Sequence, residues 1–262
     1  MSRAAEIFRR LKGGLIVSCQ APEGSPLNHP RIIAALALAA ERQGTAGVRI
    51  NSPGNIRAVR SVVSIPVIGI EKLQREGSLV YITPTLRTAL RVVGAGADIV
   101  ALDCTARRQP VDESLERIFA ELRRTADILI MADVSTAEEG LQAAGMGADL
   151  VATTLEGYTE ATRGCERPAF TLLRKLARTL SVPVVLEGRV RTPDDLRKGF
   201  EFGAHAVVVG GAITNVEWLA RAFVEAAPRK DAARVARTGS ARMTPKKGLR
   251  SFAKRKALEK RR

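Results

Sequence analysis

The sequence predicts an α/β protein: a single (β/α)8 TIM barrel formed by residues 1–227, with a basic, disordered C-terminal tail at 228–262. Eight apolar runs of strand length recur along the chain, and the gaps between them hold helix-like stretches. The runs are continuous rather than alternating, which is typical of parallel strands buried on both faces. A chain of 262 residues also fits one barrel domain.

The predicted strands are rich in valine, isoleucine and leucine. Glycines such as Gly96, Gly147 and Gly203 precede three of them, where a helix must end and glycine tolerates a left-handed backbone. In chain order the strands are Leu15–Val17, Ala46–Ile50, Pro66–Ile70, Asp98–Leu102, Asp127–Met131, Asp149–Thr153, Pro183–Leu186 and His205–Val209.

Helix starts are predicted at hydroxyl residues that precede proline or acidic residues, namely Thr83, Ser135, Thr192 and Thr214. A doubly wound sheet is the competing architecture, but it usually has fewer repeats. No GxGxxG or Walker loop follows any predicted strand, which argues against a bound dinucleotide or a P-loop nucleotide.

Charge is distributed unevenly along the chain. Residues 228–262 hold 14 of the 42 Lys and Arg but only 2 of the 27 Asp and Glu, a net charge of +12, and the remainder carries +3. The tail rather than the barrel could therefore contact anionic partners. Three cysteines without CxxC spacing and the lack of a long apolar N-terminal run predict a cytoplasmic protein with neither a disulfide framework nor a membrane span.

Polar residues follow strand after strand, and the carboxyl ends of barrel strands share one mouth. Desolvated polar groups need partners or a ligand, so we expect a functional site there. The set comprises Gln20, Arg49, Lys72, Asp103, Asp133, Thr153 with Thr154, Glu187 with Arg189, and Gly210 with Gly211. Cys19 and Cys104 also lie at this end, but no histidine follows a strand to activate a thiol.

Lys72 and Glu187 are the candidates for proton chemistry. They follow the third and seventh strands and could face one another across the mouth. Burial and neighbouring cations such as Arg49 and Arg189 would lower the lysine pKa toward the range of a general base. Gly210 and Gly211 leave backbone N–H groups bare after the eighth strand, where such barrels often bind phosphate. We therefore expect the substrate to carry a phosphate group.

Several segments resemble the N-acetylmannosamine-6-phosphate 2-epimerase family, also called N-acylglucosamine-6-phosphate 2-epimerases. They lie in one order between residues 13 and 225: Leu15–Ala21, Tyr81–Thr85, Met131–Gly140, Thr153–Leu155 with Gly157–Thr159, Glu187–Arg189, and Val207–Thr214. The resemblance implies inversion at C2 in the interconversion of N-acetylmannosamine 6-phosphate and N-acetylglucosamine 6-phosphate, in sialic acid catabolism. It implies no cofactor and no metal.

The resemblance also implies roles for individual residues. Lys72 and Glu187 match the catalytic pair. Gln20, Arg49, Asp133 and Arg189 match residues that hold the sugar, and the phosphate is expected at Gly188, Gly210 and Gly211. Lys72 would remove and return the C2 proton, Glu187 would assist ring opening or act as a second acid-base group, and Arg49 or Arg189 would stabilise an enolate.

Two departures from the family pattern are acidic. Glu71 stands where an apolar residue is usual, and Glu156 replaces a serine. Neighbouring side chains on a strand point to opposite faces, so we expect Glu71 to point away from Lys72.

Two alternative functions remain: a Schiff-base phosphosugar aldolase or isomerase that uses Lys72, and a non-catalytic phosphosugar-binding barrel with an anion-binding tail. A homodimer is expected.

Overall fold

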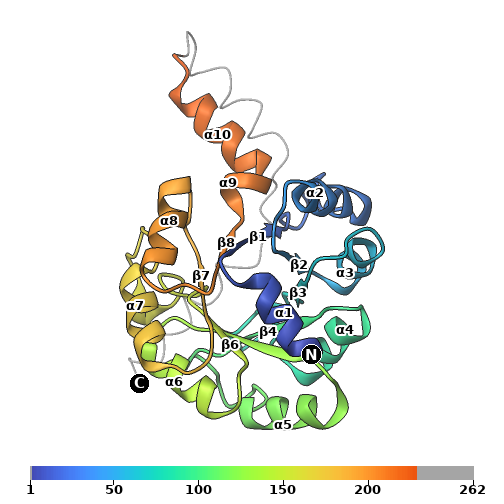
Figure 1. Ribbon diagram of the computed structural model, residues 1–262, viewed down its shortest axis with the longest axis vertical. Helices are drawn as coiled ribbons and strands as arrows, with labels where there is room; N and C mark the ends of the chain where they lie inside the picture. Colours follow the sequence, from blue (N-terminus) through green and yellow to red (C-terminus); the bar gives the residue numbers. More distant parts are fainter. Residues whose placement is uncertain (1, 229–262) are drawn as a thin grey trace, which may run out of the picture. The chain divides into compact units, whose positions relative to one another are not determined.

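The computed structural model describes residues 2–228, and the predicted basic tail lies almost wholly outside them. Eight parallel strands form a closed barrel in sequence order, from β1 to β8, with β8 paired to β1 (Figure 1). The strands are β1 Gly14–Cys19, β2 Gly47–Asn51, β3 Val67–Ile70, β4 Ile99–Asp103, β5 Leu129–Asp133, β6 Leu150–Ala152, β7 Val184–Glu187 and β8 Ala206–Val209. Each overlaps a predicted strand, and the predicted barrel is confirmed.

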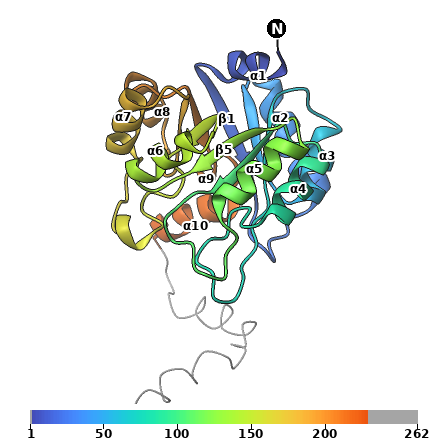
Figure 2. The same cartoon turned by 90° about the horizontal axis from the view of Figure 1, so that it is seen from below.

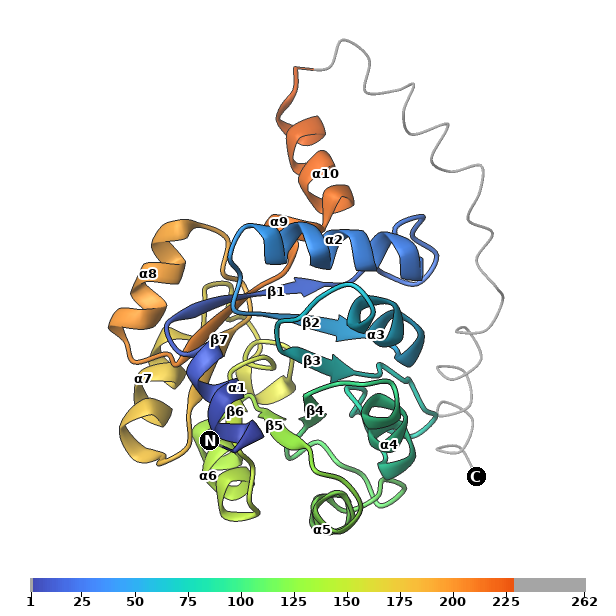
Figure 3. The same ribbon diagram turned by 45° about the vertical axis from the view of Figure 1, so that its right-hand side comes forward.

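Helices cover the outer face of the barrel, as Figure 3 shows for α2, α3 and α4 beside the first strands. The helices are α1 Arg3–Leu11, α2 Pro30–Arg42, α3 Pro53–Arg60, α4 Leu86–Gly94, α5 Leu115–Thr125, α6 Ala137–Gly145, η1 Glu160–Thr162, α7 Phe170–Thr179, α8 Pro193–Glu201, α9 Gly211–Thr214 and α10 Val216–Ala226. Within residues 2–228, none of these is long and apolar enough to cross a membrane.

Two apolar cores result from strands buried on both faces. One lies between the barrel and its helices, and the other fills the barrel interior with side chains such as Ile68, Met131 and Val208. Ile7 and Leu11 of α1 pack into the interior core. Figure 2 shows α1 on the opposite side of the barrel from α9. The N-terminal end is therefore covered, and the C-terminal end is left for the site.

The described residues divide between two units, and the boundary lies between Leu219 and Ala220, within α10. The first unit contains the whole barrel and the start of α10. The second contains the rest of α10, to Ala226. The domain boundary predicted at 227/228 remains a prediction.

Of the four residues predicted to cap helices, one does so in the structure. Thr192 caps α8 in a capping box with Asp195, as expected. In the other three cases the cap is a later residue. Thr85 caps α4, Thr136 caps α6, and Asn215 caps α10 through its Oδ1. Thr83 instead adopts a φ of 46° and accepts a hydrogen bond from the Glu71 N–H, so its hydroxyl joins two loops rather than starting a helix.

Candidate active site

A cavity of about 570 Å³ opens at the C-terminal end of the barrel. Eight of the nine site residues predicted from the sequence line it: Gln20, Arg49, Lys72, Glu187, Gly188, Arg189, Gly210 and Gly211. The ninth, Asp133, is fully buried and contacts Arg49 instead of lining the cavity. The strand ends therefore bring together residues that are up to 191 positions apart.

Arg49 forms ion pairs with both carboxylates of the site, Asp133 and Glu187. It lies within β2, is only 1% exposed, and donates two hydrogen bonds to Asp133, from Nη1 to Oδ1 at 3.0 Å and from Nη2 to Oδ2 at 2.5 Å. Nη1 also donates to Oε2 of Glu187 at 2.6 Å. This bidentate geometry is the strong form of arginine–carboxylate pairing. The two carboxylates share one guanidinium, which leaves a net negative charge when both are ionised.

Glu187 ends β7 with its side chain 13% exposed. Burial raises the pKa of Glu187, the charge of Arg49 opposes the rise, and Asp133 adds to it, so that the pKa reaches about 7. A carboxyl group with this pKa can both donate and accept a proton near neutral pH. Thr153 fixes the backbone of Glu187, since its hydroxyl donates to the carbonyl at 2.9 Å and accepts from the N–H at 3.1 Å.

Lys72 reaches the cavity from the segment after β3. Its backbone pairs with Ile82 in an isolated antiparallel bridge, and its N–H donates to Oδ1 of Asn51 at 2.9 Å. Partial desolvation by surrounding protein lowers the pKa of Lys72, and the charge of Arg49 lowers it further. The side chain is solvent-exposed in the open cavity, and water limits the size of this effect. Arg189, which was expected to lower the pKa of Lys72 as well, does not contribute to this shift.

Glu71 does not pair with Lys72, as the alternation of side chains predicts. It forms an ion pair with Arg91 of α4 at 3.1 Å, on the outer face of the barrel. The first departure from the family pattern therefore leaves the charge of Lys72 unaffected.

Arg189 closes one side of the cavity from a left-handed backbone position, with a φ of 57°. Its Nη1 donates to the carbonyl of Glu156 at 2.6 Å, and its guanidinium lies 4.2 Å from the ring centroid of Tyr158. The second acidic departure therefore contributes its backbone to the position of Arg189. Partial burial raises the pKa of the Glu156 carboxyl group, and Arg189 opposes that rise.

Gly210 and Gly211 form the turn between β8 and α9. A Cβ on Gly210 would lie 3.3 Å from the Cβ of Ser18, so this position leaves little room for a side chain. The Thr214 hydroxyl donates to the carbonyl of Ser18 at 2.8 Å and ties the turn to β1. Nε2 of Gln20 donates to the Ser18 hydroxyl at 2.8 Å. The turn therefore presents backbone rather than side chains to the cavity.

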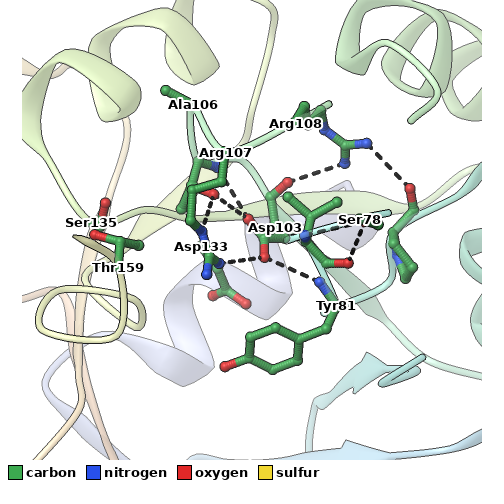
Figure 4. Close-up of polar contacts among 12 residues, drawn as sticks. Ser78, Tyr81, Asp103, Ala106, Arg107, Arg108, Asp133, Ser135 and Thr159 are labelled. Carbon is green, nitrogen blue, oxygen red and sulfur yellow. Dashed lines mark hydrogen bonds and ion pairs between the residues drawn. The ribbon is translucent and has the colours of Figure 1, made fainter. Parts of the chain in front are cut away.

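Asp103 was expected at the mouth, but it does not line the cavity. Figure 4 shows Asp103 held by Arg107 and by the backbone N–H of Tyr81. Its carboxylate also accepts two hydrogen bonds from Thr105. Asp103 is fully buried. Its hydrogen bonds join the backbone of Tyr81 to Arg107, which follows β4. The expectation for Asp103 is therefore wrong, because its oxygens are used within the protein.

Cys19 and Cys104 have the properties of structural thiols. Burial raises the pKa of Cys19 to about 12 and that of Cys104 well above its ordinary value. Neither thiol is ionised at neutral pH, and the thiolate is the nucleophilic form. Among residues 2–228, no three His, Cys, Asp or Glu side chains are grouped so as to hold a metal ion.

Sequence reasoning left out three residues that shape the cavity. Tyr158 supports Arg189 from the loop after β6, and Asn51 fixes the backbone of Lys72. Trp218 lies 5.6 Å from the guanidinium of Arg191, and both line the rim. The Gly157–Thr159 motif carried a signal for Tyr158, whereas the other two depend on contacts between distant loops.

One family model, described as "Putative N-acetylmannosamine-6-phosphate epimerase", matches residues 33–229. The chain belongs to this family. A relative from Caldanaerobacter subterraneus, named "Putative N-acetylmannosamine-6-phosphate 2-epimerase", is 47% identical over 223 residues, which cover 84% of this chain and 93% of the relative. A relative from Clostridioides difficile with the same name is 42% identical over 217 residues, covering 83% and 97%.

The structural comparison agrees with the family. The solved N-acetylmannosamine-6-phosphate 2-epimerase from Clostridium perfringens matches with a TM-score of 0.81 and 36% identity, over 84% of this chain and 96% of that one. Thiamine phosphate pyrophosphorylase from Pyrococcus furiosus, at a TM-score of 0.53 and 19% identity, over 80% of this chain and 91% of that one, shares only the fold. The family resemblance that the sequence motifs indicated is confirmed.

Proposed function

We propose that the protein interconverts N-acetylmannosamine 6-phosphate and N-acetylglucosamine 6-phosphate by inverting the configuration at C2. One observation carries the proposal. Lys72, with a lowered pKa, and Glu187, with a pKa of about 7, line the same cavity from the sides of β3 and β7. The two groups lie around Arg49, which is bonded to Glu187.

The chemistry of the substrate explains why such a pair is needed. The C2 proton becomes acidic only when the sugar ring opens, because C1 is then an aldehyde. Lys72, with its lowered pKa, is suited to remove the proton and to return it to C2. Arg49 lines the cavity and offers positive charge to an enolate oxygen. The raised pKa of Glu187 suits either ring opening or delivery of a proton to the second face.

The phosphate group is assigned to the side of the cavity formed by Gly188, Arg189, Gly210 and Gly211. Bare N–H groups and a guanidinium are common partners of phosphate. Gly188 has a φ of 108° and Gly210 has a crowded Cβ position, so side chains are disfavoured at both. Gln20 and Arg49 remain for the sugar hydroxyl and N-acetyl groups, and Asp133 holds Arg49 in place.

Proton exchange tests the function directly. In deuterated water the enzyme should incorporate deuterium at C2 of the sugar phosphate, which NMR detects without separating the epimers. Lys72→Ala should lower both exchange and epimerisation by about 10²- to 10⁴-fold, the usual contribution of a general base. Full activity in that variant would exclude the role of Lys72. Trapping of a covalent substrate adduct with borohydride would instead support the Schiff-base alternative.

The setting of the enzyme is also proposed. The buried, free Cys19 and Cys104 suit a reducing cytoplasm, and the reaction suits sialic acid catabolism. A homodimer is also proposed, and Ile213 and Val216, apolar residues that are 47% and 54% exposed, are candidates for its interface. Light scattering would measure the mass.

A further inference from the structure

Thr154 follows β6 and lies between the two carboxylates of the site. Its hydroxyl oxygen is 2.6 Å from Oδ1 of Asp133 and 3.2 Å from Oε2 of Glu187. Arg49 Nη1 bonds the same two oxygens, at 3.0 and 2.6 Å. One nitrogen and one hydroxyl therefore bridge the same pair of carboxylate oxygens.

The two bridges differ in the number of protons they hold. A guanidinium Nη carries two N–H groups, so Arg49 can donate to both oxygens at once, whereas a hydroxyl has one proton and two lone pairs. Thr154 can donate to only one carboxylate, and the other then meets its lone pair. The distance to Asp133 is shorter by 0.6 Å, the difference between a short hydrogen bond and a long one.

We propose that Thr154 is a positioning residue: it donates its single proton to Asp133 and thereby keeps the exchangeable proton of the carboxylate pair on Glu187. The lone pair that faces Glu187 accepts a hydrogen bond from the protonated carboxyl group and repels the ionised one. Asp133 meanwhile keeps both of its oxygens in the bidentate pair with Arg49. The proposal rests on the acid-base role given to Glu187 in the proposed function.

The other charged groups around Glu187 act in known directions. Arg49 from β2 and Lys72 from the segment after β3 favour ionised Glu187, whereas Asp133 from β5 favours the protonated form. Arg49 makes two hydrogen bonds to Asp133 and only one to Glu187, so Glu187 has the weaker pairing with this cation. A hydrogen bond donated by Thr154 to Glu187 would instead lower the pKa of Glu187. The shorter distance from the Thr154 hydroxyl to Asp133 is the observation that favours donation to Asp133.

Titration of Glu187 in Thr154→Val tests the proposal. Valine has the shape of threonine without the hydroxyl group, so the midpoint of Glu187 should fall by about one pH unit. Thr154→Ser should restore the wild-type midpoint. The measurement is ¹³C NMR of protein labelled at glutamate Cδ, with the Glu187 resonance assigned by its loss in Glu187→Gln. Thr154→Ala serves if the valine variant does not fold.

Thr153→Val is the matched control. It removes a neighbouring hydroxyl that bonds only the backbone of Glu187, so the midpoint should stay in place. A midpoint that rises in Thr154→Val would show that the hydroxyl donates to Glu187, and an unchanged midpoint would show no coupling. Either result, or an equal shift in Thr153→Val, overturns the proposal.

The NMR titration does not depend on turnover, so the two proposals fail separately. A downward shift without any C2 exchange would support the role of Thr154 and reject the epimerase function. In an active enzyme, the pH dependence of kcat should also change. The apparent pKa of its alkaline limb should fall in Thr154→Val, together with the titration midpoint of Glu187. A limb that stays in place or moves up would overturn the inference.

Discussion

Arg49 places one positive charge against two carboxylates beneath the cavity. Asp133 is fully buried and bonded at both oxygens, whereas Glu187 is bonded to Arg49 at one oxygen and lines the cavity. A second buried carboxylate without a cation of its own is costly to ionise. Protonation is therefore less costly to maintain on Glu187, the member of the pair that lines the cavity.

Glu187→Gln should change how stability depends on pH. The pKa of Glu187 rises from 4.5 in the unfolded chain to about 7 in the folded protein, so the folded state binds more protons between these values. Wild-type stability should therefore fall, relative to the variant, as pH rises from about 4.5 to 7, by at most about 3 kcal/mol. Urea unfolding at pH 5 and pH 8 measures the difference. Parallel pH dependence in both proteins would contradict the raised pKa.

Residue chemistry predicted much of the site because Lys72, Glu187 and Arg189 are charged groups at the ends of apolar runs. The same reasoning failed for Asp103, since nothing in its local sequence shows that Arg107 and Tyr81 use its oxygens. The contacts of Thr154 depend on distances between β5, β6 and β7. A sequence pattern identifies polar residues at the mouth, and only the folded barrel shows which oxygens are already bonded.

At the scale of elements, strand positions follow from apolar runs, while helix starts depend on single hydrogen bonds. The first hydroxyl residue after a strand can form hydrogen bonds with other groups instead of capping the helix that follows. Ser135 illustrates this, because its hydroxyl donates to Glu139 at 2.8 Å while Thr136 caps α6. The same carboxylate accepts the backbone N–H groups of Ser135 and Thr136. Local hydrogen bonds of this kind accompany helix starts that lie one or two residues after the predicted positions.

Gly69 on β3 should be intolerant of a side chain, in contrast to Gly94 on α4. A Cβ on Gly69 would lie 2.5 Å from Val92 and 2.9 Å from Ile56, inside the packing of α4 and α3 against the strand. Gly69→Ala should therefore destabilise the protein by about 1–3 kcal/mol. Gly94 is exposed and helical with open space around it, so Gly94→Ala should stabilise by about 0.5–1 kcal/mol.

Urea denaturation of the two alanine variants measures both effects in one experiment. The opposite signs separate packing from helix propensity, because both variants add the same methyl group. Equal stability in the two variants would contradict the tight packing of β3 against its helices.

At the scale of the whole molecule, closure of the barrel makes distant sequence positions into neighbours. Arg49 and Glu187 are 138 residues apart and bond at 2.6 Å, since β2 and β7 both end at the same mouth. The repeat of strand and helix predicted this closure from the sequence. The number of subunits and the partner of the tail involve surfaces rather than periodicity, and they remain predictions.

The uneven charge leads to a prediction about the entire chain. Residues 228–262 carry a net charge of +12, against +3 for the remainder, so binding to a polyanion should depend on the tail. If about six of its cations contact phosphates, affinity for DNA should fall about 10³-fold between about 50 and 200 mM salt. Fluorescence anisotropy with a labelled oligonucleotide measures the salt dependence.

A chain that ends at residue 227 is the main comparison and should lose both the affinity and its dependence on salt. A scrambled tail of the same composition is the matched control, and it should keep the binding, because counterion release depends on charge rather than order. Equal DNA binding by the full and shortened chains would show that the barrel carries the interaction. Loss of binding on scrambling would show a specific motif. Epimerase assays on all three chains would determine whether the tail also affects catalysis, since the predicted site residues all lie within residues 20–211.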